Sequence, residues 1–555
     1  MTDNQGIFGI DLGTAYSVVG YLDESGRPSV TRNSDGSDTT PSVVYFESST
    51  NVVVGQTAKT AAQGDPDNVV ALIKREMGNK DYRRTFHGTE HTAPSISGII
   101  LGSLARDAEA DTGRRVERAV ITVPAYFGLL ERDATRKAGE IAGLEVIGIV
   151  PEPVAAALHY GITGSADGST ILVYDLGGGT FDVSLMRMTE DRIEVLATGG
   201  DHHLGGADWD EKLLTHLVDE VVAQLGDDAI RDDEGLLQTL RLLAEKTKRD
   251  LSAIETKKVV IREAGKPAEV TVTRARFEEL TAALLEDTVR ITRRTLQAAE
   301  EASPGITRAI DEVLLVGGAS RMPAVPEILR KEFGWEPKLA DPDLAVAKGA
   351  ALYAAGRAVK IWEAEHGDES LGGNATGDAV AAVSAATGIA SDRLETIAAR
   401  ETVNVIPKAI GVKLVDSSLP AWQDDDRALY VEHLVEANTQ LPYDAETFHA
   451  ATVADNQESV AIELWEQAGA VKSRELRENH AVDQGSNLIE GIPPLPAGSP
   501  IDIDLRVDNE GTVSVHATEP VSGRDLRFSV RISIMSAEQV AQAKQVQRGL
   551  TISSY

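Results

Sequence analysis

The sequence lacks several features that would place it in particular classes of protein. It contains no cysteine, which excludes disulfides and thiolate metal sites and fits a reducing compartment. It has no run of about 18 uninterrupted apolar residues, so we expect no membrane-spanning helix. The first residues, MTDNQGIFGIDLG, carry no basic stretch before an apolar one. We therefore expect no secretory signal and a cytoplasmic location.

Positive charge is also scarce. The chain has 54 Lys and Arg residues against 87 Asp and Glu, a formal net charge of −33. Such an excess argues against broad binding to nucleic acids or to anionic membranes, and we expect neither as a partner. The acidic residues are spread along the chain, so solubility explains them better than an acidic tail with a function of its own.

The most informative stretch is Ile171–Met186, which reads ILVYDLGGGTFDVSLM. An apolar strand, the turn Asp175–Thr180 and an alternating run predict a β-hairpin with a glycine-rich turn. Glycines allow backbone N–H groups to approach a phosphate chain with no Cβ in the way. Asp175 and Asp182, at the mouth of the turn, suit a hydrated magnesium ion. A tight hairpin that merely needs glycine is the simpler alternative.

A second copy of this pattern favours the ligand. Ile7–Tyr16 reads IFGIDLGTAY, again an apolar strand that runs into Asp-Leu-Gly-Thr. Two such hairpins predict two related halves that face one ligand. Glu312–Arg321, EVLLVGGASR, is a third strand ending in a glycine turn. In Glu245–Ser252, charged side chains three and four apart share one helical face, for which a solvated surface is the simpler explanation.

The chain divides by its patterns, and with 555 residues it should hold more than one domain, because single cores rarely exceed roughly 250–300 residues. As far as about Arg357, strands and helices alternate as in an α/β protein. We expect helices over Asn68–Gly78, Leu129–Ala142 and Pro153–Tyr160, with Glu152 at the start of the last. A polar and then alanine-rich connection follows, over 364–400. From Val403, short alternating strands predict an all-β sandwich, and Ser536–Gln547 a short helix.

A series of collinear motifs resembles the seventy-kilodalton heat-shock (heat shock protein 70) chaperones, which are members of the actin-like ATPase superfamily. Each motif is weak alone, but the ordered set is specific. The motifs are Ile10–Ser17 (IDLGTAYS), Ala71–Lys74 (ALIK), Val123–Phe127 (VPAYF), Pro151–Ala156 (PEPVAA), Asp175–Asp182 (DLGGGTFD), His203–Gly206 (HLGG), Val316–Pro323 (VGGASRMP) and Asp341–Ala347 (DPDLAVA).

The resemblance implies a multidomain fold. An α/β actin-like (ribonuclease-H-like, duplicated) ATPase domain would occupy residues 1–358. A partly helical linker would follow over 359–402, and a β-sandwich that binds peptides over 403–535. Residues 536–555 would form a short helix and tail, with the helical lid of the family missing.

The resemblance also implies Mg²⁺-dependent, intrinsically slow hydrolysis of ATP to ADP. Asp11, Glu152 and Asp175 would hold the Mg²⁺ mainly through water, and Pro124 would be the switch that reports the nucleotide state. The residues implied in catalysis are Lys74, Glu152, Asp175, Thr180 and Asp182. Those implied around the phosphates are Asp11, Gly13, Thr14, Ala15, Tyr16, Gly177, Gly178, Gly179 and Gly206. Those implied around the nucleoside are Glu245, Lys248, Arg249, Ser252, Gly317, Gly318, Ala319, Arg321 and Asp343.

In the sandwich, the resemblance implies a groove for unfolded or apolar peptide segments of client proteins. Its lining would be Val412, Val415, Val453, Val460 and Ile462, although ordinary core positions would look the same. An apolar pocket combined with strand-like backbone pairing selects for hydrophobicity and not for a particular sequence. A nucleotide-exchange factor is the other partner that the resemblance implies.

The sequence departs from the family at four places. Ala15 replaces a hydroxyl residue of the phosphate loop, which leaves the backbone cradle in place. Val146–Val150 lacks the basic residue that helps to dock J-domain cochaperones, so stimulation by such a partner is not predicted. A long alanine-rich segment replaces the short linker that couples the two domains. Without a lid, we expect fast release of peptide, because a lid acts mainly on the off-rate.

Two functions from different classes fit these observations. The first is an ATP-dependent chaperone-like protein. The alternative is a nucleotide-dependent scaffold or regulator that binds one dedicated protein partner, which the altered linker, the missing lid and the missing basic residue favour. A small-molecule kinase of the same superfamily fits less well, because it leaves the sandwich unexplained and no catalytic base can be identified.

Overall fold

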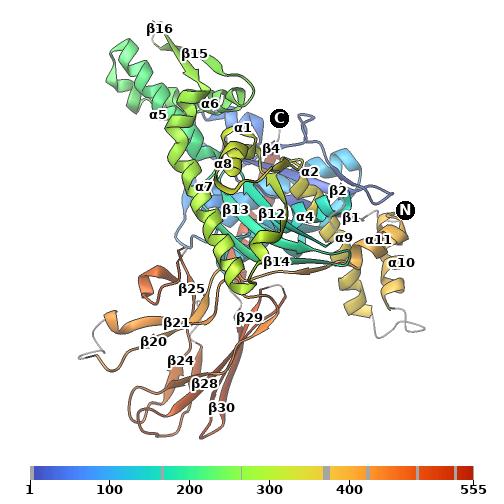
Figure 1. Cartoon of the computed structure of the whole chain (residues 1–555), viewed down its shortest axis with the longest axis vertical. Helices are drawn as coiled ribbons and strands as arrows, with labels where there is room; N and C mark the ends of the chain where they lie inside the picture. Colours follow the sequence, from blue (N-terminus) through green and yellow to red (C-terminus); the bar gives the residue numbers. More distant parts are fainter. Residues whose placement is uncertain are drawn as a thin grey trace.

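The computed structural model describes residues 5–163, 168–263, 266–366, 375–419, 426–469, 471–482, 487–509, 511–530 and 534–553. A mixed α/β part, blue to yellow in Figure 1, lies against a group of antiparallel strands coloured orange to brown. Within the ranges given, no helix has the length and apolar character needed to cross a membrane.

The first half of the α/β part is built on one mixed sheet. Strand β1 pairs in parallel with β10 and antiparallel with β2, so the hairpin expected at Ile7–Tyr16 lies at its centre. The sheet consists, in order, of β11 (Glu145–Pro151), β10 (Arg115–Val123), β1 (Gln5–Asp11), β2 (Tyr16–Leu22) and β3 (Pro28–Val30), with β4 (Thr40–Pro41) paired to β2.

The second half repeats this arrangement. Here β12 pairs antiparallel with β13 and in parallel with β17, just as β1 pairs with β2 and β10. The order is β18 (Lys338–Leu339), β17 (Ile310–Val316), β12 (Ser169–Leu176), β13 (Phe181–Met188), β14 (Arg192–Asp201) and β19 (Glu401–Val403). The predicted duplication is therefore confirmed at the level of strand order.

Helices cover both sheets, and two of them lie in the middle of the α/β part. Helices α4 (Glu152–Thr163) and α9 (Ala345–His366) cross so closely that a Cβ on Gly349 would lie 1.7 Å from the carbonyl oxygen of Ala155. The other helices of this part are α1 (Gln56–Ala61), α2 (Ala93–Thr112), α3 (Leu129–Ile141), α5 (Gly206–Leu225), α6 (Glu234–Leu251), α7 (Arg274–Ala302) and α8 (Ala324–Phe333).

Most of the expected elements are present, but the helix expected over Asn68–Gly78 is wrong. Its β-branched start forms β7 (Val69–Val70), which pairs with β5 (Val44–Phe46). Leu72 then adopts a left-handed backbone with φ 57°, and a single 3-10 turn follows over Ile73–Glu76. The β pairing and the left-handed residue prevent a continuous helix, and the turn brings Lys74 to a buried position.

The connection to the strand-rich part contains two helices. Helix α9 runs on to His366, residues 367–374 of the expected polar segment lie outside the described part, and α10 (Ala375–Thr387) and α11 (Ser391–Ala398) follow. Both helices contact α9, beside which they lie in Figure 1. The chain then forms β19, which pairs in parallel with β14. This segment therefore continues the second sheet before the chain leaves it.

Within the described residues, the strands after β19 that precede α12 form two larger antiparallel sheets and a two-stranded one, and they share one apolar core. This confirms the predicted all-β part. One sheet contains β21 (Leu429–Val435), β20 (Ile410–Val415), β25 (Leu464–Gln467) and β26 (Asn479–Ala481). The other contains β22 (Tyr443–Asp444), β23 (Phe448–Ala451), β28 (Pro500–Val507), β29 (Val513–Glu519) and β30 (Arg524–Val530). The two-stranded sheet pairs β24 (Ser459–Ala461) with β27 (Leu488–Glu490).

The last described segment returns to the α/β part. Helix α12 (Ala537–Arg548) begins at Ser536, whose side chain accepts from the Gln539 N–H, as the sequence predicts for a cap. Strand β31 (Thr551–Ser553) then joins a small sheet with β6 (Asn51–Val54), β5 and β7. Two hairpins complete the fold, β8 (Arg84–Phe86) with β9 (Thr89–His91) and β15 (Thr256–Glu263) with β16 (Lys266–Thr273).

Candidate functional site

A cavity of about 830 Å³ lies between the two halves of the α/β part. Nearly all of the site residues predicted from the sequence line it, although they come from many elements. They are Asp11, Gly13, Thr14, Ala15, Tyr16, Lys74, Glu152, Asp175, Gly177, Gly178, Thr180, Gly206, Glu245, Lys248, Arg249, Ser252, Gly317, Gly318, Ala319, Arg321 and Asp343. Gly179 and Asp182 belong to the same hairpin as Asp175 and lie just behind this lining.

Buried carboxylates and one buried lysine form the floor of the cavity. Lys74 is 3% exposed, and its Nζ lies 2.5 Å from Oε1 of Glu152, which opens helix α4. Desolvation raises the pKa of Asp11 to about 7 and the pKa of Asp182 to about 8, and the charge of Glu152 adds to both shifts. The pKa of Asp175 is raised as well, by burial and then by Glu152, Asp182 and Asp11. One lysine does not offset this much negative charge.

The donor set fits a hard cation that is held through water. Asp11, Asp175 and Glu152 offer only carboxylate oxygens, which Mg²⁺ prefers, and Mg²⁺ usually keeps several of its own waters. Among the residues that the structure describes, no three acidic or histidine side chains stand close enough to ligate one ion directly. The raised pKa values of these carboxylates also favour a cation site, because a bound divalent cation would stabilise the charged forms of the carboxylates.

The two predicted hairpin turns face each other across the cavity at very close range. A Cβ on Gly179 would lie 2.2 Å from Cγ2 of Thr14. Gly317, in the third glycine turn, has φ 78°, and its Cβ would lie 2.4 Å from Oδ1 of Asp175. Glycine is therefore needed at both positions for steric reasons, and at Gly317 for its backbone conformation as well. The N–H of Gly206 donates to the carbonyl of Gly177 at 2.9 Å, so Gly206 supports the turn.

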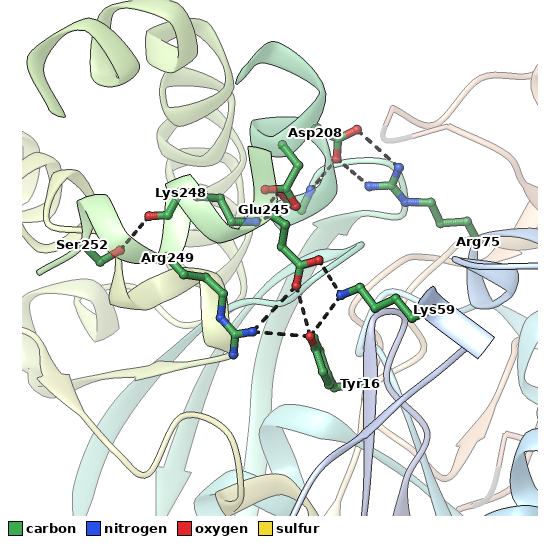
Figure 2. Close-up of polar contacts among 11 residues, drawn as sticks. Tyr16, Lys59, Arg75, Asp208, Glu245, Lys248, Arg249 and Ser252 are labelled. Atoms are coloured by element: carbon green, nitrogen blue, oxygen red, sulfur yellow. Dashed lines mark hydrogen bonds and ion pairs between the residues drawn. The ribbon is translucent and has the colours of Figure 1, made fainter. Parts of the chain in front are cut away.

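One polar cluster joins the two halves over the mouth of the cavity, as Figure 2 shows. Glu245, from α6, accepts a hydrogen bond from the hydroxyl of Tyr16 at 3.1 Å and forms an ion pair with Lys59 of α1. The guanidinium of Arg249 lies over the ring of Tyr16, 5.6 Å from its centroid. The charged stripe on α6 is thus not a purely solvated face, because Glu245 contacts the opposite half.

A second bridge lies deeper in the molecule. Arg75 donates to the carbonyl of Gly179 at 2.9 Å and pairs with Asp208 at 2.5 Å (Figure 2). Sequence reasoning gave no role to Arg75, Asp208 or Lys59. Arg75 had a visible signal, since it follows Lys74 directly. Nothing in the sequence pointed to Lys59 or Asp208, because each finds its partner in the opposite half.

The segment after β10 connects the cavity to the sandwich. It begins at the buried Pro124, and the N–H of Tyr126 donates to Oδ1 of Asp182 at 2.9 Å. On its other side, the hydroxyl of Tyr126 donates to the carbonyl of Gly469 in the sandwich at 3.0 Å. The N–H of Leu129, the first residue of α3, donates to Glu466 of β25 at 3.0 Å. This short segment therefore contacts the glycine-rich hairpin beside the cavity, at Asp182, and the sandwich at the same time.

A buried charge cluster stands where α3 meets the sandwich. Lys408 is 1% exposed and lies 3.1 Å from Glu131 of α3. Burial opposes the charge of Lys408, but Glu131 and Glu466 raise its pKa overall. Burial raises the pKa of Glu466 to about 7. Burial also opposes the charge of Glu131, but the neighbouring Lys408 outweighs it, and the pKa of Glu131 is lowered overall. Burial lowers the pKa of His202 to about 4, so this side chain is neutral.

The residues predicted to line a peptide groove lie in different environments. Val412 and Ile462 are 1% and 4% exposed and belong to the apolar core of the sandwich, against which Val460 packs. Val415 and Val453 are half-buried. Their assignment to a groove stays a prediction.

Comparison with known proteins adds a finding on ancestry. A family model described as "Hsp70 protein" matches residues 7–85, 81–360 and 426–550. Two curated relatives, both named chaperone protein DnaK, come from Thermotoga petrophila and from Thermotoga sp. strain RQ2. Each is 37% identical over 528 residues, a match that covers 94% of this chain and 79% of the relative. The stretch without a family match, 361–425, contains α10, α11 and β19.

Proposed function

Because the chain belongs to the Hsp70 family, we propose that it is an ATP-dependent chaperone that binds and hydrolyses ATP and holds exposed apolar peptide segments in its sandwich. The observation that carries the first part is the cavity itself. Two related hairpin turns, the Lys74–Glu152 pair and the carboxylates Asp11 and Asp175 all converge on it. Its volume of about 830 Å³ is ample for a nucleotide.

In this proposal, the chain's own residues position the phosphates and the attacking water. Lys74, held by Glu152, donates toward the phosphate oxygens, while the backbone of the two glycine turns surrounds the phosphate chain. Thr180 and Asp182 complete the phosphate end. When bound, hydrated magnesium supplies positive charge that offsets the phosphate oxygens. Phosphoryl transfer depends mainly on positioning and charge neutralisation, which this set of residues can provide, and we expect the intrinsic rate to be slow.

The sandwich supplies the peptide-binding part of the proposal. We propose that extended apolar segments bind near Val415, Val453 and Val460, and that release is fast because α12, the helix that follows the sandwich, packs on α2 and α3. The contacts of Tyr126 with Asp182 on one side and with Gly469 on the other support a nucleotide-dependent rate of release. A nucleotide-exchange factor is a proposed partner, and stimulation by a J-domain cochaperone is not proposed.

A second candidate is a nucleotide-dependent scaffold for one dedicated partner. The observation that favours it is the position of α10 and α11 in a stretch that the family model does not match. Elements outside the family match are places where a dedicated partner could bind.

The two candidates differ in their response to unrelated peptides. We would measure ATP turnover alone and with a panel of unfolded apolar peptides of different sequence, with polar peptides of equal length as controls. A chaperone should bind most of the apolar panel, and a scaffold should ignore most of it. Absence of ATP turnover in the purified chain would contradict the ATPase part of the chaperone proposal.

A further inference from the structure

The C-terminal segment of the chain, residues 534–553, does not cover the sandwich from which it comes. In Figure 1 the C-terminal end lies beside α1 and α2 of the α/β part, away from the sandwich strands. We call this segment the C-terminal strap. It contains α12 and β31, and it contacts the first half of the α/β part at three successive places.

The first contact is an apolar one. The N–H of Ile534 donates to Oδ2 of Asp133 on α3 at 3.0 Å. The side chains of Ile534, Met535 and Val540 are 7%, 6% and 6% exposed and belong to the same core cluster as helix α2. Burial of these three apolar side chains stabilises the binding of the strap at this one position on the α/β part.

The second contact is a notch in α2. Gln547, near the end of α12, donates from Nε2 to the carbonyl of Gly98 at 3.0 Å. A Cβ on Gly102, one turn further along α2, would lie 2.7 Å from the same Nε2. The three nearest atoms that such a Cβ would meet all belong to Gln547 and Ile552 of the strap. Glycine inside a helix costs about 1 kcal/mol relative to alanine, and at Gly102 its lack of a side chain leaves the space that the end of the Gln547 side chain occupies.

The third contact is strand pairing. Strand β31 pairs in parallel with β6, with Thr551 opposite Asn51 and Ile552 opposite Val52. The N–H of Thr551 also donates to the carbonyl of Thr50 at 2.8 Å. The strap therefore covers the edge of the small sheet, in the manner of a peptide that adds a strand.

These contacts bind the sandwich at both of its ends. Its entry is tied to the second half, because β19 pairs with β14 and the side chain of Gln440 donates to Oε1 of Glu194 on β14 at 2.7 Å. Its exit is tied to the first half. Only residues 531–533 separate Val530, at the end of β30, from Ile534, a span of at most about 14 Å. While the strap is seated, the sandwich cannot move away from α3.

We propose that residues 534–553 are an intramolecular strap that keeps the sandwich docked on the α/β part in every nucleotide state. Nucleotide then acts on the sandwich through the contacts of the 124–129 segment and not through separation of the two parts. The strap raises the local concentration of the sandwich at its interface with α3, so even weak contacts across this interface stay formed. The statement about nucleotide states rests on the proposed ATP binding, whereas the position of the strap on the α/β part does not, and disulfide formation without nucleotide tests that position by itself.

The test uses the full chain, which has no natural cysteine to interfere. Asn51→Cys and Thr551→Cys place two thiols at paired positions on neighbouring strands, within the range that a disulfide spans. We expect an intramolecular disulfide to form at the same rate without nucleotide, with ADP and with ATP. A disulfide between two chains would overturn the proposal, because the strap would then be exchanged between copies. Formation in one nucleotide state only would also overturn it.

A point variant tests whether the strap holds the sandwich. Gly102→Leu fills the notch and keeps α2 helical, and Ala110→Leu, at an exposed position of α2, is the matched control. We expect Gly102→Leu to slow disulfide formation and to speed hydrogen exchange of the Leu129 amide, each at least about tenfold. The control should change neither. A strap released by Gly102→Leu with unchanged exchange at Leu129 would show that the strap does not hold the sandwich.

Discussion

Removal of the buried Lys408, where α3 meets the sandwich, should raise the fraction of molecules in which this interface is open. Lys408 is almost fully buried and lies against Glu131, with Glu466 on its other side. Lys408→Met keeps the length of the side chain but leaves two carboxylates buried without their cation. Loss of one partner of a buried ion pair costs about 3–5 kcal/mol. When the interface opens, the carboxylates regain water, so this cost falls on the closed state.

The amide of Leu129 reports this opening directly, because its N–H donates to Glu466 across the interface. Exchange of such an amide with solvent requires local opening, so a cost of about 3–5 kcal/mol corresponds to exchange faster by about 10²–10⁴-fold. We would measure it at pH 8 by hydrogen exchange with mass spectrometry or NMR. Below pH 7, protonation of Glu466, whose pKa is about 7, would hide part of the effect.

Two further variants make the prediction specific. Lys413→Met removes a lysine whose pair with Glu463 is partly exposed, 26% and 35%, and should change the exchange of Leu129 by less than about fivefold. Glu131→Gln combined with Lys408→Met removes the charges of the Lys408–Glu131 pair and leaves Glu466 as the one carboxylate without its cation, so it should restore part of the protection. Equal exchange in Lys408→Met and Lys413→Met would refute the reasoning that the cluster holds the interface closed.

Three further predictions concern the cavity and the interface. Lys74→Ala and Asp175→Asn should each lower single-turnover ATP hydrolysis by at least about 10²-fold, because each removes charge compensation at the phosphates; turnover equal to the unmodified chain would exclude these roles. Lys59→Ala should speed ADP release several-fold, because it removes the ion pair with Glu245 over the cavity mouth, which stabilises the closed cavity by about 1 kcal/mol. Stopped-flow release of a fluorescent ADP analogue measures this rate. An unchanged rate would show that the ion pair does not hold the cavity closed. In the closed interface the pKa of Glu466 is raised from 4.5 to about 7, so protonated Glu466 stabilises the closed interface by about 3 kcal/mol at most. This stabilisation is complete below pH 4.5 and is lost as pH rises through 7. The exchange rate of the Leu129 amide, corrected for intrinsic base catalysis, should therefore rise between pH 6 and 8, and Glu466→Gln should abolish this rise.

Local patterns were sufficient to predict the central elements. The strand and turn residues around Asp175 and Asp11 specify hairpins by themselves, and the repeat of the pattern indicates the duplication that the strand order confirms. Glu152 was expected at the start of a helix because a proline follows it, and it opens α4. Membership of the Hsp70 family, predicted from motifs in order, is confirmed by the comparisons.

Features that depend on distant contacts were not predictable. The pattern of Asn68–Gly78 suits a helix, but pairing of Val69 and Val70 with β5 overrides it. Lys59 and Asp208 bind partners in the opposite half, and no local signal marks such pairs. The short helix after Ser536 was expected with its cap, but its seat on α2 depends on Gly102, which looked like any other helical glycine.

The central claim is that nucleotide controls the hold of the sandwich on apolar peptide. The most direct test is fluorescence anisotropy of a labelled apolar peptide, with the chain saturated first with ADP and then with ATP. The account predicts binding with ADP and faster release with ATP while the disulfide between positions 51 and 551 stays formed. No binding of apolar peptide in either state would contradict the account and would leave the dedicated-partner scaffold as the better explanation.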